Sequence, residues 1–299
     1  LRGMKILILG GTGLISTYIT QQLLARGDEV WHFNRGQRAA GFGGISFCGP
    51  IHTIVGDRAQ AARFEAQMRD APMFDCVIDM IGYAPVDVES DLRVFAGRCG
   101  HLIFCSTVDV YAHPHPSGAL PYREDAPQAG RNAYAASKVA GEAIGHTYHH
   151  LHCLPVVALR FFTVFGPRQR PDLAINKFVR LMLAGESIPV FGDGRSSRDY
   201  TFVGDIVRGL LLAADSDLTY ETINLGNSQP VALSELIAAL EQVVGCPARI
   251  ERLPEQPGDM PHTYANVAKA ERLLGWRPEV SLEEGLADFV AWHRRTANV

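Results

Sequence analysis

Unbroken apolar runs and helical periodicity alternate along the first half of the chain. Residues 5–9 are apolar without alternation, as in a parallel strand that is covered on both faces. Apolar residues then recur at helical spacing from Leu14 to Leu24, and Gly27 follows where the helix is expected to end. A second strand is predicted over residues 29–34. Together these elements form a strand–helix–strand unit at the start of the chain.

The same alternation continues and predicts the fold class. Further strands are expected at 51–55, 76–81, 101–105 and 154–160, and further helices at 132–150 and 172–185. Residues 113–131 are rich in Pro, Gly and charge, which is typical of a surface loop. Alternating strands and helices indicate an α/β fold of the Rossmann type, with a doubly wound parallel sheet.

The strand–helix rhythm weakens after about residue 166, where Pro and Gly cluster in GPRQRPD and IPVFGDGRSSRD. A smaller second domain is therefore expected, built mainly from the C-terminal half. We predict a dinucleotide-binding Rossmann domain over residues 1–165, with a return segment at about 203–226. The smaller domain, which would bind the substrate, is predicted over residues 166–299.

Composition and charge narrow the class of protein. The chain has 299 residues and a formal net charge of −4, from 28 Lys and Arg against 32 Asp and Glu. The chain has no excess of basic residues, so its net charge does not favour a dedicated nucleic-acid-binding protein. No apolar run approaches the roughly 18–20 residues of a membrane span. The first apolar segment meets Gly10 too soon for a secretory signal, so a cytoplasmic location and no membrane partner are expected.

Cysteine and histidine residues do not indicate a metal site. The six cysteines contain no C-x-x-C pair, which is typical of small buried hydrophobic residues in a reducing compartment. Histidines surround Tyr148, but the local sequence supplies no acidic or cysteine partners at ligand spacing. We therefore expect neither a disulfide framework nor a metal.

A glycine turn follows the first predicted strand directly. Gly10-x-x-Gly13 would place backbone N–H groups and a helix N-terminus against a pyrophosphate. Ser16 takes the place of the third glycine of the usual spacing and is small enough to keep helix and strand close. The position between a strand and a helix favours dinucleotide binding over a glycine turn without a ligand.

The residues that would distinguish NAD from NADP leave both cofactors open. An acidic residue at the end of the second strand would accept from the ribose 2′-hydroxyl of NAD, but Asn34 stands there and Arg35 follows. Asn can bond that hydroxyl, whereas Arg could meet the 2′-phosphate of NADP. Asp57 has the chemistry to accept from the adenine amino group, and equally that of a turn or helix cap.

The best catalytic signal is Tyr134-Ala-Ala-Ser-Lys138. On a helix, residues at i and i+4 share one face, so an ammonium would lie near the phenol and lower its pKa from about 10. The phenolate could then take a proton from a sugar hydroxyl. Upstream, the strand HLIFC ends in Ser106-Thr107, at the edge where parallel sheets bind ligands. By itself, Y-x-x-x-K is a common surface pattern. Downstream of a dinucleotide-binding turn and of a strand that ends in Ser-Thr, it indicates a catalytic pair.

A series of strings in order resembles the extended short-chain dehydrogenases/reductases of the nucleotide-sugar epimerase and dehydratase type. Beyond the glycine turn, the strings are STVDVY (106–111), NAYAASKVAGE (132–142), RFFTVFGPRQRPD (160–172), FGDGRSSRDYTFVGDI (191–206) and PGDMPHTYANVAKAERLLGW (257–276). In the C-terminal half, GPRQRPD and QPGD are most similar to UDP-glucuronate 4-epimerases. The resemblance covers nearly the whole chain.

The resemblance implies a role for each matching residue. Tyr134 is the base, Lys138 holds the nicotinamide ribose and tunes Tyr134, and Thr107 bonds the reacting sugar oxygen. NAD would be held by Tyr134, Lys138 and the residues Gly10, Thr12, Gly13, Leu14, Ile15, Asn34, Arg35, Asp57 and Arg58, with NADP not excluded. The nucleotide sugar would meet Thr107, Thr163, Arg168, Arg170, Arg198 and Asp259. Arg168 and Arg170 suit a sugar carboxylate or the diphosphate, and relatives of this kind lead us to expect a homodimer.

Departures from the pattern keep rival functions open. Val108 stands where a dehydratase needs an acid, which disfavours dehydration, while Asp109 falls where decarboxylating relatives carry Glu. The strings NRG (34–36) and DMIGY (79–83) resemble an atypical branch, some of whose members lost catalysis or bind RNA. The leading hypothesis is an NAD-dependent UDP-sugar 4-epimerase, with UDP-glucuronate as one candidate substrate. The alternatives are an NAD(P)-dependent reductase or decarboxylase and a non-catalytic protein that binds nucleotide or RNA.

Overall fold

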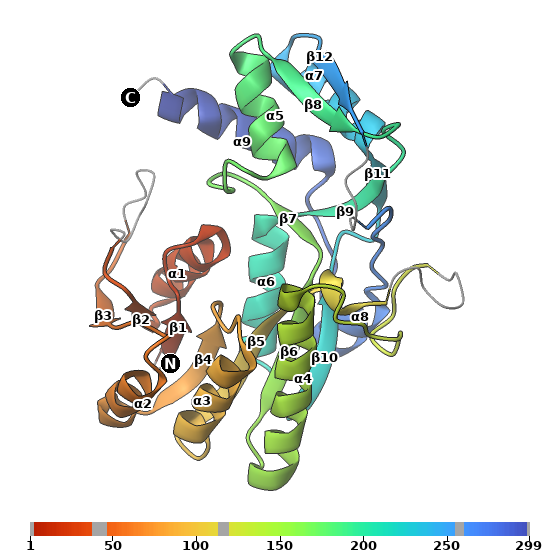
Figure 1. The fold of residues 1–299 in the computed structure, drawn as a ribbon. Helices are drawn as coiled ribbons and strands as arrows, with labels where there is room; N and C mark the ends of the chain where they lie inside the picture. Colours follow the sequence, from red (N-terminus) through yellow and green to blue (C-terminus); the bar gives the residue numbers. More distant parts are fainter. Residues whose placement is uncertain (1–2, 38–46, 113–119, 255–259, 298–299) are drawn as a thin grey trace.

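A seven-stranded parallel sheet forms the larger part of the computed structural model, which describes residues 3–37, 47–112, 120–254 and 260–297 (Figure 1). In sheet order its strands are β10 (Tyr220–Leu225), β6 (Val156–Phe161), β5 (Cys99–Thr107), β4 (Phe74–Asp79), β1 (Lys5–Leu9), β2 (Glu29–Asn34) and β3 (Ile51–Val55). Every neighbouring pair is parallel. The predicted doubly wound sheet is confirmed.

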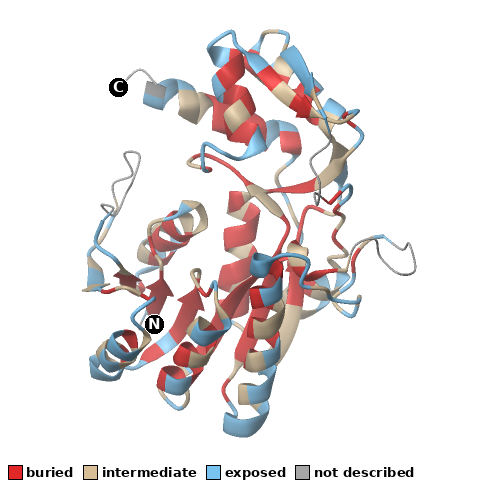
Figure 2. Cartoon of the chain, in the orientation of Figure 1, coloured by how far each residue is buried: buried red, intermediate tan, exposed pale blue. Residues whose placement is uncertain are grey.

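Helices cover both faces of this sheet. One layer contains α1 (Leu14–Arg26), α6 (Val203–Ala214) and α8 (Ala268–Leu274), and the other contains α2 (Ala61–Asp70), α3 (Pro85–Phe95) and α4 (Ala133–His152). Successive residues of β1 enter opposite cores: Ile6 and Ile8 pack beneath α1 and α6, and Leu7 and Leu9 beneath α2 and α3. This two-sided burial explains the unbroken apolar runs, and Figure 2 shows the sheet as the most deeply buried layer.

Element boundaries follow the sequence pattern closely in this half. The strands predicted at 5–9, 29–34 and 51–55 coincide with β1, β2 and β3. β4 begins and ends two residues earlier than predicted, at Phe74 and Asp79, because Phe74 is buried and already pairs with Cys99 of β5. The helix predicted at 132–150 is α4, which runs to His152.

A second group of elements lies beyond the end of the large sheet opposite the N-terminus (Figure 1). It contains a three-stranded sheet of β11 (Pro230–Ala232), β9 (Ser197–Phe202) and β7 (Thr163–Phe165), and a pair of β12 (Arg249–Leu253) and β8 (Ser187–Phe191). Helices α5 (Ala174–Leu183), α7 (Leu233–Val244) and α9 (Leu282–Ala297) pack into the same core. Of these elements the sequence pattern indicated α5 alone.

Several segments cross between the two groups. α6 and β10, within the predicted return segment, belong to the large sheet and its helical layer. Trp276 also packs there, with its indole N–H donating to the carbonyl of Asp205 at 2.9 Å, although 166–299 was assigned to the smaller domain. The division into two domains stays an interpretation, and the segment around Trp276 packs with the large sheet rather than with the smaller group.

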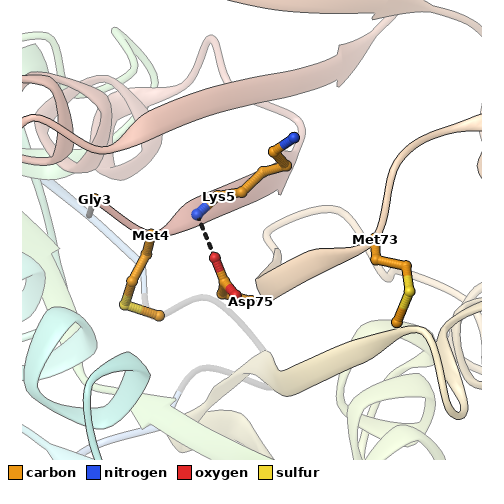
Figure 3. A pocket seen from close by; sticks show the side chains of 5 residues that line it. All are labelled: Gly3, Met4, Lys5, Met73 and Asp75. Carbon is orange, nitrogen blue, oxygen red and sulfur yellow. Dashed lines mark hydrogen bonds between the residues drawn. The ribbon is translucent and has the colours of Figure 1, made fainter.

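The amino ends of β1 and β4 carry none of the predicted site residues. A cavity of about 330 Å³ lies there, lined by Gly3, Met4, Lys5, Met73 and Asp75 (Figure 3). Within it the backbone N–H of Lys5 donates to Asp75 at 2.6 Å. Among the described residues no helix is both long and apolar enough to cross a membrane.

Candidate active site

Thr107, Tyr134 and Lys138 meet at the carboxyl edge of the large sheet. Thr107 is the last residue of β5, and a single 3-10 turn (Val108–Val110) follows it. Tyr134 and Lys138 lie in the first two turns of α4, which Asn132 caps by accepting from the N–H of Ala135 at 2.8 Å. The capped helix start therefore fixes the two side chains relative to the strand end.

Ser106 and Thr107 point to opposite sides of β5, so their roles differ. The Ser106 hydroxyl donates to Glu142 at 2.5 Å, inside the protein. The Thr107 hydroxyl accepts from the N–H of Asp109 at 3.3 Å and lies 3.4 Å from its carboxylate. Of the two hydroxyl groups, that of Thr107 is the one that bonds the Tyr134 side chain.

Lys138 is almost completely buried, at 2% exposure. Its ammonium donates to the carbonyls of Gly82 (2.9 Å) and Cys105 (2.7 Å), which leaves one N–H for a ligand. The nitrogen lies 5.9 Å from the centre of the Tyr134 ring, as the shared helix face predicts. Burial lowers the pKa of Lys138, against the attraction of Asp79, the strongest opposing charge.

The pKa of Tyr134 differs from the sequence prediction. Desolvation by the surrounding protein raises it to about 12, while a hydrogen bond from Thr107 lowers it and the charge of Asp109 raises it. Lys138, which was expected to lower the pKa of Tyr134, is not among the strongest of these influences. In this structure Tyr134 is therefore a phenol at neutral pH.

The glycine turn is shaped for close approach to a ligand. Gly10 and Gly11 have φ of +116° and +77°, and a Cβ on Gly11 would lie 2.5 Å from the ring of His32. Ser16, in place of the third glycine, accepts from the N–H of Gly13 at 2.8 Å. Gly13, the N-cap of α1, has no side chain that could accept from the backbone N–H groups of the first turn, near which Thr12, Leu14 and Ile15 also lie. A pyrophosphate fits this open helix end.

His32 supports the turn from below and is expected to make stability depend on pH. The Thr20 hydroxyl donates to Ser16 and accepts from the His32 ring, whose other nitrogen is buried without a hydrogen-bond partner. Burial lowers the His32 pKa to about 4. Since the unfolded value is about 6.5, the folded state loses stability as pH falls from 6.5 toward 4.

We expect His32 to cost about 2 kcal/mol of unfolding free energy between pH 7 and pH 5. His32→Gln, which does not titrate, should lack this part of the pH dependence. Urea unfolding of both proteins at the two pH values measures the difference. If the free energy of unfolding changes equally between the two pH values in both proteins, His32 does not cause the pH dependence.

The three residues predicted to bind the adenosine part of the cofactor make different contacts in the structure. Asn34 accepts from the N–H of Gly36 at 2.8 Å, and Arg35 is exposed. Asp57 accepts from the N–H of Ala59 at 3.0 Å, which is the turn role, and one carboxylate oxygen remains for a ligand. Their contacts with a cofactor stay predictions.

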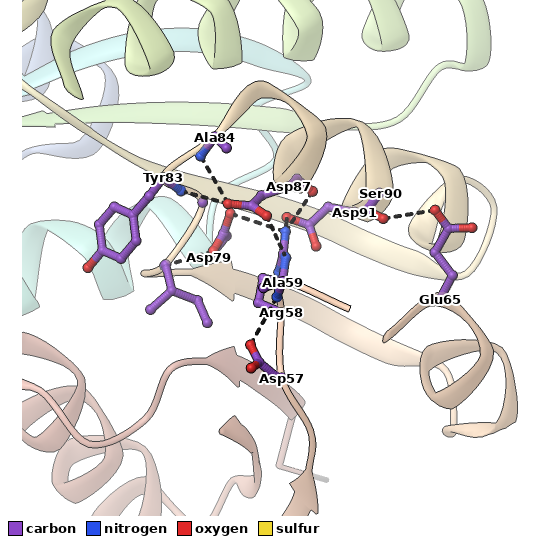
Figure 4. Close-up of polar contacts among 12 residues, drawn as sticks. Asp57, Arg58, Ala59, Glu65, Asp79, Tyr83, Ala84, Asp87, Ser90 and Asp91 are labelled. Carbon is purple, nitrogen blue, oxygen red and sulfur yellow. Dashed lines mark hydrogen bonds and ion pairs between the residues drawn. The ribbon is translucent and has the colours of Figure 1, made fainter. Parts of the chain in front are cut away.

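Arg58 points into the protein rather than toward a cofactor. Its side chain is 8% exposed and lies 2.6 Å from Asp91 and 3.8 Å from Asp79, and it donates to the carbonyl of Asp87 (Figure 4). Sequence reasoning missed this cluster because the three aspartates lie far from Arg58 along the chain.

A cavity of about 630 Å³ opens among the elements of the smaller group. Of the predicted substrate residues, Thr163 and Arg198 line it, and so does Arg195 from the same arginine-rich stretch of the sequence. Arg198 donates to the carbonyls of Ser197 and Pro261. Asp259 lies outside the described residues. The cavity thus combines cationic side chains with a size suited to a nucleotide.

Arg168 and Arg170 do not line this cavity. Arg170 is exposed and pairs with Asp172 at 3.0 Å. Arg168 has φ of +80°, and its Nε and Nη1 are buried without a hydrogen-bond partner. Desolvation lowers its pKa, opposed by the nearby Tyr18 of α1. A half-buried guanidinium with two unpaired nitrogens suits an anion bound between α1 and the loop that follows β7.

Tyr83 is a site residue that sequence reasoning missed. Its ring lies 6.4 Å from that of Tyr134, and the Lys138 nitrogen lies 5.4 Å from its centre. The sequence contained one indication of this role: Tyr83 follows closely after β4, whose carboxyl end lies beside those of β1 and β5.

Comparison with known families decides the classification. Residues 6–226 match the model of the NAD dependent epimerase/dehydratase family. The chain belongs to this family. The match spans the glycine turn, Thr107, Tyr134 and Lys138. The family is NAD-dependent by description, in agreement with the open α1 terminus beside a buried lysine.

Relatives and solved structures place the chain more closely within the epimerase/dehydratase family. A UDP-glucuronate 4-epimerase of Thermodesulfobacterium geofontis is 39% identical over 194 residues, covering 64% of this chain and 59% of the relative. UDP-glucuronate 4-epimerase 5 of Arabidopsis thaliana is 31% identical, covering 97% and 76%. The crystal structure of a Bacillus cereus UDP-glucuronic acid 4-epimerase with UDP-glucuronic acid and NAD superposes with a TM-score of 0.82, at 25% identity, covering 98% and 99%. The chain spans about three fifths of the length of the first curated relatives it matches.

Proposed function

We propose that this protein is an NAD-dependent 4-epimerase of UDP-sugars, with UDP-glucuronate as the first substrate to test. The observation that carries the proposal is the meeting of Thr107, Tyr134 and Lys138 at the carboxyl edge of the sheet whose first strand leads into the glycine turn. The relatives named as UDP-glucuronate 4-epimerases support the substrate class.

The residues present fit the dinucleotide. The open start of α1 and the glycine turn would hold the pyrophosphate, and the remaining N–H of Lys138 would reach a ribose hydroxyl. When bound, NAD supplies reversible acceptance of a hydride from the sugar C4. The protein contributes orientation, proton transfer and exclusion of water.

Tyr134 and Thr107 would handle the proton and the oxygen at C4. Tyr134 would take the proton of the C4 hydroxyl in its phenolate form, which desolvation disfavours in the protein alone and which the positive charges of Lys138 and of a bound nicotinamide ring would stabilise. Thr107 would hold the same oxygen by a hydrogen bond. The resulting 4-keto sugar then turns its other face toward the same groups. Tyr134 returns the proton to the oxygen, which yields the epimer with no net oxidation. Enclosure by the smaller group of elements keeps the keto sugar in place.

The cavity would bind the nucleotide part of the substrate. Arg195 and Arg198 line it and supply positive charge for a diphosphate. We also infer that Arg168 or Arg170 meets the second anion, either the sugar carboxylate or the dinucleotide pyrophosphate. A small basic pocket within a slightly acidic chain is sufficient for these ligands.

Purified protein incubated with UDP-glucuronate, UDP-glucose and UDP-N-acetylglucosamine tests the proposal. We expect the C4 epimer of at least one sugar, seen by proton NMR, without added cofactor. Released carbon dioxide would instead favour decarboxylation, the alternative that Asp109 beside Thr107 supports. Consumption of added NADH would favour a reductase. Absence of any epimer from protein with intact bound NAD contradicts the proposal.

We also propose that the protein is a cytoplasmic homodimer. The family resemblance supports the dimer, and the six free cysteines suit a reducing compartment. Light scattering of the purified protein at micromolar concentration measures its mass, and a monomer would contradict the dimer.

A further inference from the structure

The end of β4 carries a buried carboxylate next to the catalytic lysine. Asp79, the last residue of β4, is 1% exposed and accepts from the N–H of Ile81 at 2.9 Å. A Cβ on Gly82 would lie 2.2 Å from the other carboxylate oxygen of Asp79. The carboxylate is therefore packed directly against the turn that follows the strand.

This turn reaches Lys138 through its backbone. The carbonyl of Gly82 accepts from the Lys138 ammonium at 2.9 Å, and the carbonyl of Cys105 on β5 accepts at 2.7 Å. One of the two acceptors that orient the ammonium thus belongs to a segment that Asp79 holds. Moving the turn would move the ammonium.

The far side of the turn is held by Asp87 and Arg58. Asp87 of α3 accepts from the N–H groups of Tyr83 (3.1 Å) and Ala84 (2.9 Å). Arg58 lies between Asp79, Asp87 and Asp91, and Figure 4 shows the carboxylates gathered around its side chain. One buried guanidinium therefore faces three carboxyl groups, and burial raises the pKa of Asp91 well above its usual range.

We propose that Asp79 is a positioning residue for Lys138, because it fixes the turn whose Gly82 carbonyl holds the ammonium and adds a negative charge behind it. The proposal rests on the proposed function and assigns a role to the string DMIGY, which departs from the usual family pattern. The proximity of Gly82 to Asp79 and the hydrogen bonds of Ile81 and Gly82 carry it independently of any titration.

The charges around Lys138 indicate what the Asp79 carboxylate does electrostatically. Burial lowers the pKa of Lys138, and the groups that raise it are Asp79 on β4, Cys105 on β5, Asp87 on α3 and Glu142 on α4. Asp79 is the strongest of the four. Without its charge, the buried ammonium is expected to lose its proton at a lower pH.

Asp79→Asn separates charge from geometry, because the amide oxygen still accepts from Ile81. We expect the alkaline limb of the kcat–pH profile to move down by about 1 pH unit, with KM for the sugar unchanged. The affinity for NAD, measured by calorimetry from pH 7 to pH 10, should begin to fall at correspondingly lower pH. Asp79→Ala also releases the turn and should lower kcat about a further tenfold.

Asp125→Asn is the matched control, since it removes an exposed carboxylate that pairs with Arg123. It should leave both pH profiles unchanged. If Asp79→Asn does not fold, Gly82→Ala displaces the same turn with every charge kept, because its Cβ would lie 2.2 Å from the Asp79 carboxylate, and it should weaken NAD binding. An unchanged NAD-binding profile in the folded variant overturns the proposal, even where sugars are epimerised. A shifted NAD profile in a protein that turns over no sugar supports Asp79 and refutes the epimerase.

Discussion

Tyr134→Phe is expected to lower kcat for epimerisation by about 10²–10⁴-fold while the protein keeps its fold and bound NAD. The substitution removes one oxygen, the group that exchanges a proton with the C4 hydroxyl. Neither of the other two proposed catalytic residues is placed to take over this task. Lys138 is committed to two carbonyls, and Thr107 is bonded at the end of β5.

Tyr148→Phe provides the matched control for this prediction. Tyr148 lies on the same helix, α4, three turns or more from Tyr134, and packs on the core between the sheet and its helices. Its hydroxyl has no place in the site, so kcat should stay within about twofold of the original protein. NMR of the sugar products gives kcat for both variants, and absorbance after denaturation gives the NAD content. A Tyr134→Phe protein with more than a tenth of the original kcat would refute Tyr134 as the base.

The large sheet could be predicted because its local patterns agree with its long-range packing. Residues 5–9 form an unbroken apolar run because both faces of β1 are covered, so the pattern alone indicates the strand. In the smaller group, β7 and β11 have three residues each, too few to establish a period. Their strands are defined by pairing with β9, a contact that no local pattern contains.

The sequence predicted the relative placement of Tyr134 and Lys138 but not the electrostatics around them. The i and i+4 spacing correctly placed Tyr134 and Lys138 on one face of α4. The direction of the Tyr134 pKa shift was wrong, because desolvation depends on atoms from distant segments. Arg58 shows the same limit: next to Asp57 it looked like a cofactor contact, whereas aspartates of β4 and α3 draw it inward.

A buried ion pair fixes the helix that carries Tyr134 and Lys138 to the strands behind it. Arg160 of β6 donates two hydrogen bonds to Glu142 of α4, at 2.9 and 2.6 Å, and both side chains are almost inaccessible. Glu142 also accepts from Ser106, the neighbour of Thr107, and from Gln128. The three proposed catalytic residues therefore depend on one carboxylate for their mutual placement.

Arg160→Met is expected to reduce the free energy of unfolding by about 3–5 kcal/mol, because it leaves Glu142 buried without its countercharge. Urea denaturation measures the loss. The double variant Arg160→Met/Glu142→Gln should recover at least half of it, since the amide still bonds Ser106 and carries no charge. Arg123→Met, which breaks an exposed ion pair, should cause no measurable change. If the single and double variants were equally unstable, lost packing of Arg160 rather than the unpaired charge would account for the effect, and α4 would owe its position to packing alone.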